Sequence, residues 1–293
     1  MTDGLALDLP NYDELWDYAD PQATERVFRE LEARYPQNEA QSWRLELRTQ
    51  IARTLGLQRR FDEAHALLDE VDESLPPSDS IAGLRSSLER GRLHRSTGNI
   101  SVSIPLFEKA WHTAQKLNHD PLAVDAAHML AIVIEGEGGL GWHERARSLA
   151  TTSSDPGANR WLASLANNLG WTYHGLKRFE DALDCFEQAL TLREEKGDPE
   201  AIRVARWCVG RCLRSLDRLP DALAIQRRLL DEYTEAGEES GYVHEELGEL
   251  LLVTNAAEEA RPHFKKASQI LRKDEWLQET DADRLARLER LAG

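Results

Sequence analysis

The sequence predicts an all-α solenoid built from antiparallel helix hairpins, and two observations carry this prediction. The first is the stretch from Ser164 to Lys196, where apolar residues recur every three or four positions on both sides of Gly175. This spacing places them on one face of each of two helices, with the glycine supplying the turn. Neither helix can bury its apolar face alone, so the hairpin requires stacked neighbours.

The second observation is that the hairpin repeats along the chain. Small residues at the close-packing position of each first helix recur at steps of 39, 40, 39, 40 and 38. They are Ala52, Gly91, Ala131, Gly170, Gly210 and Gly248. In five copies a second small residue follows 12 positions later, and in the third copy Ala146 follows after 15. We therefore expect six helix pairs, at about residues 41–80, 81–120, 121–160, 161–199, 200–239 and 240–274.

Capping elements are expected at both ends of the stack. Residues 1–40 contain a predicted capping hairpin over 11–18 and 21–35, which Pro36 ends because proline cannot continue a helix. Residues 275–293 contain a predicted single last helix over 275–291. Polar, charged ends keep the terminal faces of a solenoid from associating.

Glycine, asparagine and proline mark the turns within the repeats. Turns are expected at Gly98-Asn99 and at Asn255, and Pro220 suits the start of a second helix. Pro262 lies about two turns into the second helix of the sixth pair, where it removes a backbone hydrogen bond. We therefore expect a kink or a later helix start at Pro262.

The third copy is irregular, because the segment Glu135–Gly141 is glycine-rich and three residues longer than its equivalents. We interpret it as an inter-helix loop, which is either a tolerated insertion or a mobile lid over a binding groove. It is not a phosphate-binding loop, since no strand precedes it and no Lys-Ser or Lys-Thr pair follows.

The fourth copy carries a family resemblance. It reads Leu169-Gly170-x-x-Tyr173, followed by Ala182-x-x-x-Phe186 and Ala189, and so resembles the tetratricopeptide repeat in its longer, roughly 40-residue variant. Similar patterns extend over about residues 41–274. The resemblance implies a right-handed superhelix whose first helices line the concave side. It also implies a scaffold or peptide-binding role, although the pattern does not name the partner.

Composition narrows the classes of function. The chain has 41% hydrophobic and 30% charged residues, and no apolar run reaches the roughly 18 residues that span a membrane. Its first residues lack the features of a secretory signal, and three cysteines form no disulfide framework, so we expect a cytoplasmic location. The net charge of −16 disfavours nucleic acid as a partner and is concentrated near the two ends, which favours solubility as its role.

The sequence contains no catalytic or metal-binding motif, so we expect no enzyme, cofactor or metal. Cys208 and Cys212 are four residues apart on one helix, but no histidine joins them, and we interpret them as core residues. Three functions stay open: an adaptor that binds a peptide, which we favour, a sensor of a small ligand or signalling peptide, and a helical-repeat enzyme. The oligomeric state is left open.

The candidate groove follows from the concave stripe of the first helices that the resemblance implies. Its predicted partner-binding residues are Arg53, Arg85, Arg92, Arg95, His128, Asn167, Asn168, Trp171, His174, Trp207, Arg211 and Arg214. The hypothesis is an extended, net acidic peptide held by the arginines of the second and fifth copies around an Asn-Trp centre, because arginine forks suit carboxylates. The alternative is that these arginines pair with neighbouring acids and that the tryptophans pack between helices.

Overall fold

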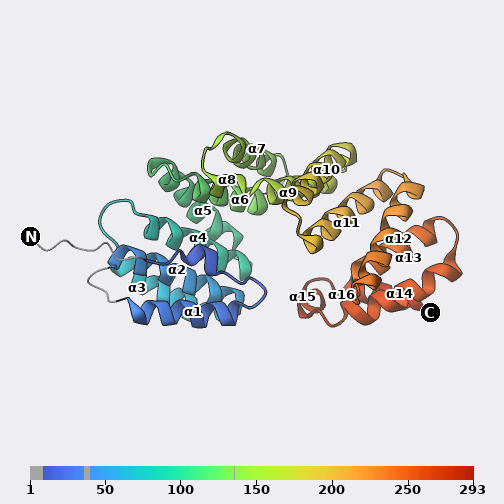
Figure 1. The fold of residues 1–293 in the computed structure, drawn as a ribbon, viewed down its shortest axis with the longest axis horizontal. Coiled ribbons are helices and arrows are strands. Elements are labelled where there is room, and N and C mark those ends of the chain that lie inside the picture. The colour runs from blue at the N-terminus through green and yellow to red at the C-terminus, as the bar shows by residue number, and fades with distance from the viewer. Residues whose placement is uncertain (1–8, 36–39, 135) are drawn as a thin grey trace, which may run out of the picture. The chain divides into compact units, whose positions relative to one another are not determined.

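A computed structural model describes residues 9–35, 40–134 and 136–293, which are mostly helical and contain no strand (Figure 1). The predicted helix stop at Pro36 and the first residue of the glycine-rich segment, Glu135, lie outside the described residues. The chain divides into two compact units, Met1–Trp161 and Leu162–Gly293, and each is described by itself.

The N-terminal unit stacks three helix pairs behind a terminal helix. A short 3₁₀ helix, η1 (Tyr12–Leu15), precedes α1 (Pro21–Arg34). The pairs are α2 (Gln41–Leu57) with α3 (Phe61–Glu73), α4 (Ile81–Ser96) with α5 (Ile100–Lys116), and α6 (Asp120–Val133) with α7 (Gly136–Thr152). A single turn, α8 (Pro156–Asn159), packs on the third pair.

The C-terminal unit has the same design. Its pairs are α9 (Leu162–Gly175) with α10 (Phe179–Lys196), α11 (Pro199–Ser215) with α12 (Leu219–Glu235), and α13 (Gly241–Val253) with α14 (Ala257–Leu271). Two further helices, α15 (Glu275–Thr280) and α16 (Ala282–Ala292), follow. The predicted all-α fold of antiparallel helix pairs is confirmed.

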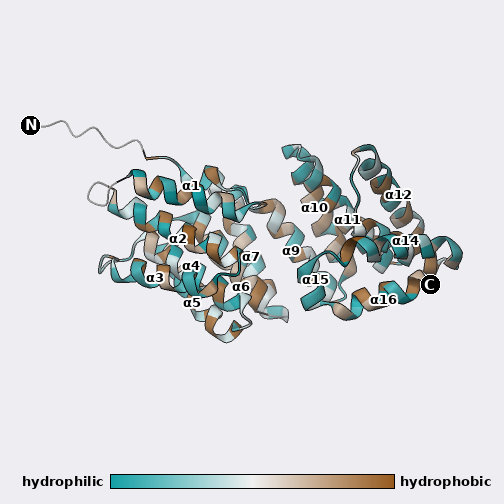
Figure 2. Cartoon of the chain, turned by 90° about the horizontal axis from the view of Figure 1, so that it is seen from below, coloured by the Kyte–Doolittle hydropathy of each residue, from teal (hydrophilic) through white to brown (hydrophobic). Residues whose placement is uncertain are grey.

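The recurring small residues are explained by close packing between the two helices of a pair. A Cβ added at Gly170 would lie 2.6 Å from the Phe186 ring, and one added at Gly248 would lie 2.7 Å from the Phe264 ring. Both rings are fully buried. Hydrophobic and hydrophilic residues alternate around the helices, so each has an apolar side for its neighbours (Figure 2).

The turns between paired helices use a left-handed residue that is mostly not glycine. In the fourth pair it is Lys177, at φ 60°, whereas Gly175 is the last residue of α9 and not the turn residue that we predicted. Asp217 and Asn255 take the equivalent place in the next two pairs, at φ 59° and 61°. Asparagine and aspartate tolerate this conformation better than most residues.

The predicted glycine-rich loop is wrong for the residues that the structure describes, because α7 begins at Gly136. A Cβ at Gly139 would lie 2.2 Å from the backbone oxygen of Ile134, so only glycine allows this close approach to the end of α6. The glycines therefore permit a tight start of α7, and the lid interpretation is not supported.

Two expectations about helix ends also differ from the structure. Of the two outcomes predicted at Pro262, the later helix start is wrong, because α14 begins at Ala257 and continues through Pro262, and the kink stays a prediction. Pro105 occupies the same repeat position in α5, and in both helices proline is the sixth residue, where it removes one intrahelical hydrogen bond. The predicted last helix is two helices separated at Asp281, since Leu277 and Leu288 both turn into the core.

None of the helices in the described ranges is long and apolar enough to cross a bilayer.

Candidate partner-binding site

The C-terminal unit presents a continuous face built from its first helices, and α11 forms the centre of it. Starting from Glu200, steps of four, three, four and three residues lead to Val204, Trp207, Arg211 and Arg214. This spacing places all five side chains on one side of α11. Neighbouring positions come from α9, α13 and α16. We call this surface the first-helix face of the C-terminal unit.

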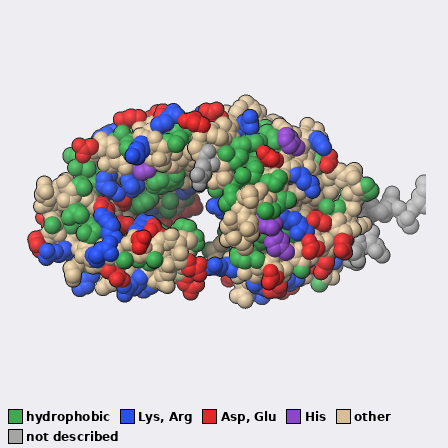
Figure 3. Space-filling model, turned by 180° about the vertical axis from the view of Figure 1, so that it is seen from behind, with side chains coloured by type: hydrophobic (Ala, Val, Ile, Leu, Met, Phe, Trp, Pro, Cys, Tyr) green, Lys and Arg blue, Asp and Glu red, His purple; other side chains and the backbone are tan. Residues whose placement is uncertain are grey.

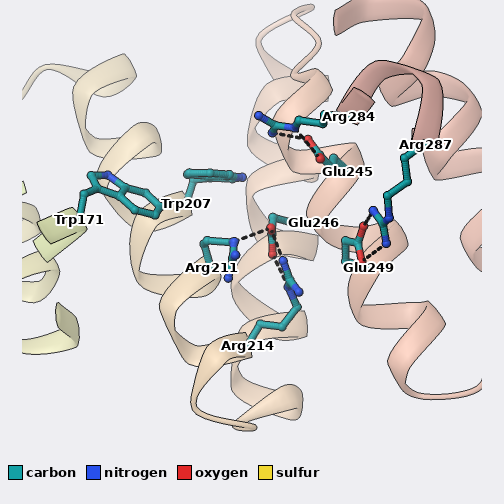
Figure 4. A pocket seen from close by; sticks show the side chains of 9 residues that line it. All are labelled: Trp171, Trp207, Arg211, Arg214, Glu245, Glu246, Glu249, Arg284 and Arg287. Carbon is teal, nitrogen blue, oxygen red and sulfur yellow. Dashed lines mark hydrogen bonds and ion pairs between the residues drawn. The ribbon is translucent and has the colours of Figure 1, made fainter. Parts of the chain in front are cut away.

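A charged hollow of about 420 Å³ lies on this face (Figure 4). Its lining residues are Trp171, Trp207, Arg211, Arg214, Glu245, Glu246, Glu249, Arg284 and Arg287. The three glutamates come from α13, and the arginines approach them from α11 on one side and α16 on the other (Figure 4). The four arginines leave one positive charge in excess over the three glutamates.

Glu246 is the most buried carboxylate of the charged hollow, with 5% of its side chain exposed. Arg214 donates two hydrogen bonds to it, each of 2.8 Å, and the Nε atom of Arg211 lies 3.1 Å from the same carboxylate. Two-point pairing of this kind fixes the guanidinium plane as well as its distance. One buried carboxylate therefore orients both arginines of α11.

The other two glutamates are paired across to α16. Arg284 donates to Glu245 through Nε at 2.8 Å and through Nη2 at 2.5 Å. Arg287 donates to Glu249 at its two carboxylate oxygens. These pairs join the last helix of the unit to the first helix of the sixth pair, so α16 completes the charged hollow.

Arg211 is the arginine with the least complete pairing to a carboxylate. It shares Glu246 with Arg214, and its Nη1 atom donates to the Ser215 hydroxyl at 2.8 Å. Burial lowers the pKa of Arg211. Burial also acts to lower the pKa of Arg214, but the hydrogen bonding to Glu246 and the charges of the three glutamates together outweigh it, so the pKa of Arg214 is raised. A ligand carboxylate would therefore interact more favourably with Arg211 than with the other arginines of the charged hollow.

An apolar hollow of about 360 Å³ adjoins the charged one. Its lining residues are Asn167, Trp171, Glu200, Val204, Trp207, Cys208, Tyr233, Ser240, Tyr242 and Val243. Val204 is 40% exposed and contributes an apolar side chain to the lining. The polar groups at the edge are satisfied, since the Tyr233 hydroxyl donates to Glu200 at 3.1 Å.

Trp171 and Trp207 line both hollows and so connect them. Their ring centroids are 6.0 Å apart, and the two rings lie side by side (Figure 4). Trp207 is held by a hydrogen bond of 3.1 Å from Nε1 to the backbone oxygen of Tyr242, and Trp171 packs edge-on against Phe186. Both tryptophans are thus half-buried, fixed in orientation and open on one side.

The structure brings together several of the predicted site residues in this unit. Asn167, Trp171, Trp207, Arg211 and Arg214 all line one hollow or both. The remaining two lie beside them: His174 bonds the Ser215 hydroxyl at 2.9 Å, and Asn168 accepts a hydrogen bond from Asn167.

Three of the four predicted arginines of the N-terminal unit are held in ion pairs. Arg92 donates to Asp125 at 2.6 Å and to Glu89 at 2.5 Å, and Arg53 reaches Glu89 at 3.4 Å. The other two predicted arginines, Arg85 and Arg95, differ from each other. Arg85 pairs with Asp13 at 2.9 Å, whereas Arg95 is exposed and forms no ion pair among the described residues.

Figure 3 shows acidic and basic side chains intermingled over the face of each unit that it displays. Pairing of this kind is the alternative that the sequence left open for the arginines. The predicted contribution of Arg53, Arg85, Arg92 and Arg95 to partner binding stays a prediction.

Buried histidines of the N-terminal unit predict a loss of stability in acid. Burial lowers the pKa of His128 and of His143 to about 4 each, from 6.5. The unfolded chain therefore takes up their protons first, so their contribution is present above pH 6.5 and is lost as the pH falls toward 4. We expect a loss of roughly 2 kcal/mol per histidine between pH 7 and pH 5. Urea unfolding at several pH values measures it.

The control for this pH dependence is His112→Gln, because His112 is exposed. The double variant His128→Gln, His143→Gln should show a flatter pH dependence than this control. Equal slopes in the two variants would contradict the assignment.

The sequence pattern did not identify Glu246, Tyr233 or the two arginines of α16 as residues that line the hollows. Continuing the repeat period one step beyond Gly248 reaches Ala286, 38 residues later, which places a seventh first helix on α16. Arg287 then takes the place that Arg211 holds in the fifth copy. The periodicity could therefore have found Arg287, whereas nothing in the sequence pattern marked Glu246 as the shared carboxylate.

The cysteines of this unit are packing residues. Burial raises the pKa of Cys208 to about 12 and that of Cys212 to about 11, so both are thiols near neutral pH. No group of three or more His, Cys, Asp or Glu side chains suited to a metal ion occurs in the part of the chain that the structure describes.

Comparison with known proteins agrees with the repeat architecture. Residues 135–195 match the family model described as tetratricopeptide repeat. The matched segment, residues 135–195, therefore carries the tetratricopeptide-repeat pattern. The resemblance that the fourth copy showed is thereby confirmed, and no curated protein sequence matches the chain.

Several solved structures have a similar tetratricopeptide-repeat fold. The apo form of RapI has a TM-score of 0.69 at 12% identity, covering 90% of this chain and 76% of RapI. NprR, in complex with its cognate peptide NprX, has a TM-score of 0.58 at 15% identity and coverages of 96% and 81%. A tetratricopeptide repeat protein from Parabacteroides merdae has a TM-score of 0.51 at 14% identity, with coverages of 96% and 98%. At these identities the likeness concerns the fold alone.

Proposed function

We propose that this chain is a non-enzymatic interaction module and that the first-helix face of its C-terminal unit binds a peptide segment of a partner protein. The observation that carries the proposal is the meeting of an apolar and a charged hollow at Trp171 and Trp207. Pockets that combine apolar walls with a few placed polar groups are typical ligand sites. A peptide can place an apolar side chain beside Val204 and a carboxylate against Arg211.

Two further points support a peptide as the ligand. NprR, which has a similar fold, was solved in complex with its cognate peptide. The charged hollow carries one excess positive charge. Arg211 shares its only carboxylate partner within the hollow with Arg214, so it can still pair with a carboxylate of a ligand. We therefore propose that the bound segment is acidic near its apolar anchor, in keeping with the net acidic partner inferred from the sequence.

The test is a selection of 12-residue peptides from a displayed random library on the immobilised chain, followed by fluorescence anisotropy with the selected peptides. We expect them to combine an aromatic or branched aliphatic residue with an acidic one. Val204→Asp places a charge in the apolar hollow, and Arg211→Glu reverses the charge beside it, so each should weaken binding by about tenfold or more.

Arg218→Glu is the matched control for Arg211→Glu. Arg218 lies at the turn between α11 and α12, is 51% exposed in its side chain and pairs with Asp221. The same charge reversal there should leave binding unchanged. The proposal fails if the selected peptides bind Val204→Asp and Arg211→Glu as tightly as they bind the Arg218→Glu control.

The second candidate is a sensor of a small apolar ligand, favoured by the 360 Å³ volume of the apolar hollow. Loss of peptide binding in Val204→Asp together with full binding in Arg211→Glu would favour this alternative, since a neutral ligand needs no arginine.

A further inference from the structure

The first-helix face of the N-terminal unit is covered by the chain's own N-terminal segment, which we define as Asn11–Tyr18. The Tyr12 hydroxyl donates to Glu46 at 2.6 Å, and the Trp16 ring nitrogen donates to Gln50 at 3.3 Å. Both partners lie on α2. These contacts lay the segment along the first helix of the first repeat.

The covered positions are the repeat equivalents of residues that line the two hollows of the C-terminal unit. Equivalent positions are counted from the close-packing small residue of each copy, which is Ala52 in the first copy and Gly248 in the sixth. The positions compared lie six residues before, two residues before and one residue after it. In the first copy they are Glu46, Gln50 and Arg53, and in the sixth they are Tyr242, Glu246 and Glu249. The same surface is therefore occupied in one unit and hollow in the other.

Side chains, and not a backbone ladder, hold the segment in place. Among the described residues, no backbone hydrogen bond joins residues 11–18 to α2 or α4. The guanidinium of Arg53 lies 5.8 Å from the Trp16 ring and 5.6 Å from the Tyr18 ring. Cation–π contacts of this kind are modest when exposed, and a segment held by side chains alone can be exchanged for another of the same chemistry.

Asp13 supplies the carboxylate that pairs with Arg85, a buried arginine of α4. Arg85 is 9% exposed, donates to Asp13 at 2.9 Å and stacks over the Tyr12 ring at 5.2 Å. A buried guanidinium without a carboxylate is costly, so this place requires an acidic residue next to an aromatic one. The segment matches it with the sequence Asn-Tyr-Asp-Glu-Leu-Trp-Asp-Tyr.

We propose that the N-terminal segment is a built-in ligand of this face, and that a partner peptide with an acidic residue between aromatic residues displaces it. The proposal concerns a second surface and does not depend on the site in the C-terminal unit. Tyr12 is the anchor of the segment, since it is buried in the core cluster that also contains Phe28 and Ile51. An incoming peptide must therefore supply an aromatic side chain to replace Tyr12.

The direct test uses the full-length chain carrying Arg211→Glu, so that binding at the other proposed site is weakened. The probe is a synthetic peptide with the sequence of residues 9–20. At saturating peptide, amide hydrogen exchange of residues 12–18 should accelerate at least about tenfold, while the exchange of α2 and α4 stays slow. Unchanged exchange of residues 12–18 would overturn the proposal.

A binding measurement gives a second, independent test. In Asp13→Asn, Trp16→Ala the segment loses its carboxylate and its cation–π partner, so the fluorescein-labelled peptide should bind about tenfold more tightly than to the parent chain. Glu14→Gln is the matched control, because within the described ranges the Glu14 side chain bonds only Asn11. If the double variant loses stability without binding the peptide more tightly than the Glu14→Gln control, the segment is a fixed cap and the proposal is wrong.

Discussion

Replacement of Phe186 by alanine is expected to lower the free energy of unfolding by about 3–5 kcal/mol. Phe186 is fully buried in α10, and its ring fills the space over Gly170 and beside Trp171. The substitution removes the ring and leaves a cavity that two rigid helices cannot close. Urea denaturation followed by circular dichroism measures the loss.

The control for this prediction is Val253→Ala, since Val253 lies in the same unit and is 51% exposed. We expect that change to cost less than about 0.5 kcal/mol. A loss at Phe186 as small as the loss at Val253 would contradict the packing argument.

Gly170→Ala sharpens the test, because its new Cβ would lie 2.6 Å from the Phe186 ring. Alone it should destabilise the chain, whereas in the Phe186→Ala background it fills part of the cavity. The two changes together should therefore cost less than their sum. Additive effects would show that the ring and the glycine do not share one space.

The sequence was sufficient for the architecture because each repeat obeys the same two packing rules. A small residue on the first helix and a large one on the second produce the observed contacts at Gly91 with Phe107 and at Gly248 with Phe264. Since the first helices recur at nearly constant spacing in all six copies, the residues that lie along their shared stripe could also be predicted. The predicted stripe contains Trp171 and Arg211, which both line the charged hollow.

The parts that the sequence did not predict depend on contacts between residues far apart in the chain. The glycines of the third copy look like a loop, and only the carbonyl of Ile134 against Gly139 shows why a helix begins there. The shared use of Glu246 by two arginines follows from how α13 packs on α11, which periodicity does not define. The occupation of the N-terminal face by Asn11–Tyr18 likewise lies outside any repeat pattern.

Replacement of Glu246 by glutamine should lower stability and raise affinity for acidic peptides at the same time. Removal of one partner of a buried ion pair typically costs about 3–5 kcal/mol, and we expect about 2–4 here because Arg211 and Arg214 keep some contact with water. The two freed guanidiniums then present an uncompensated positive site. Urea denaturation measures the first effect, and anisotropy of an acidic peptide at increasing salt measures the second.

Glu249→Gln is the matched control for this variant, because its only ion-pair partner among the described residues, Arg287, is about half exposed. An exposed guanidinium returns to water at little cost, so we expect a loss below about 1 kcal/mol there. The prediction requires that Glu246→Gln lower the free energy of unfolding and raise the affinity for the acidic peptide. The gain in affinity should become smaller as the salt concentration rises. If Glu246→Gln is as stable as Glu249→Gln, then Glu246 does not hold the arginines of α11, and the charged hollow owes its shape to helix packing alone.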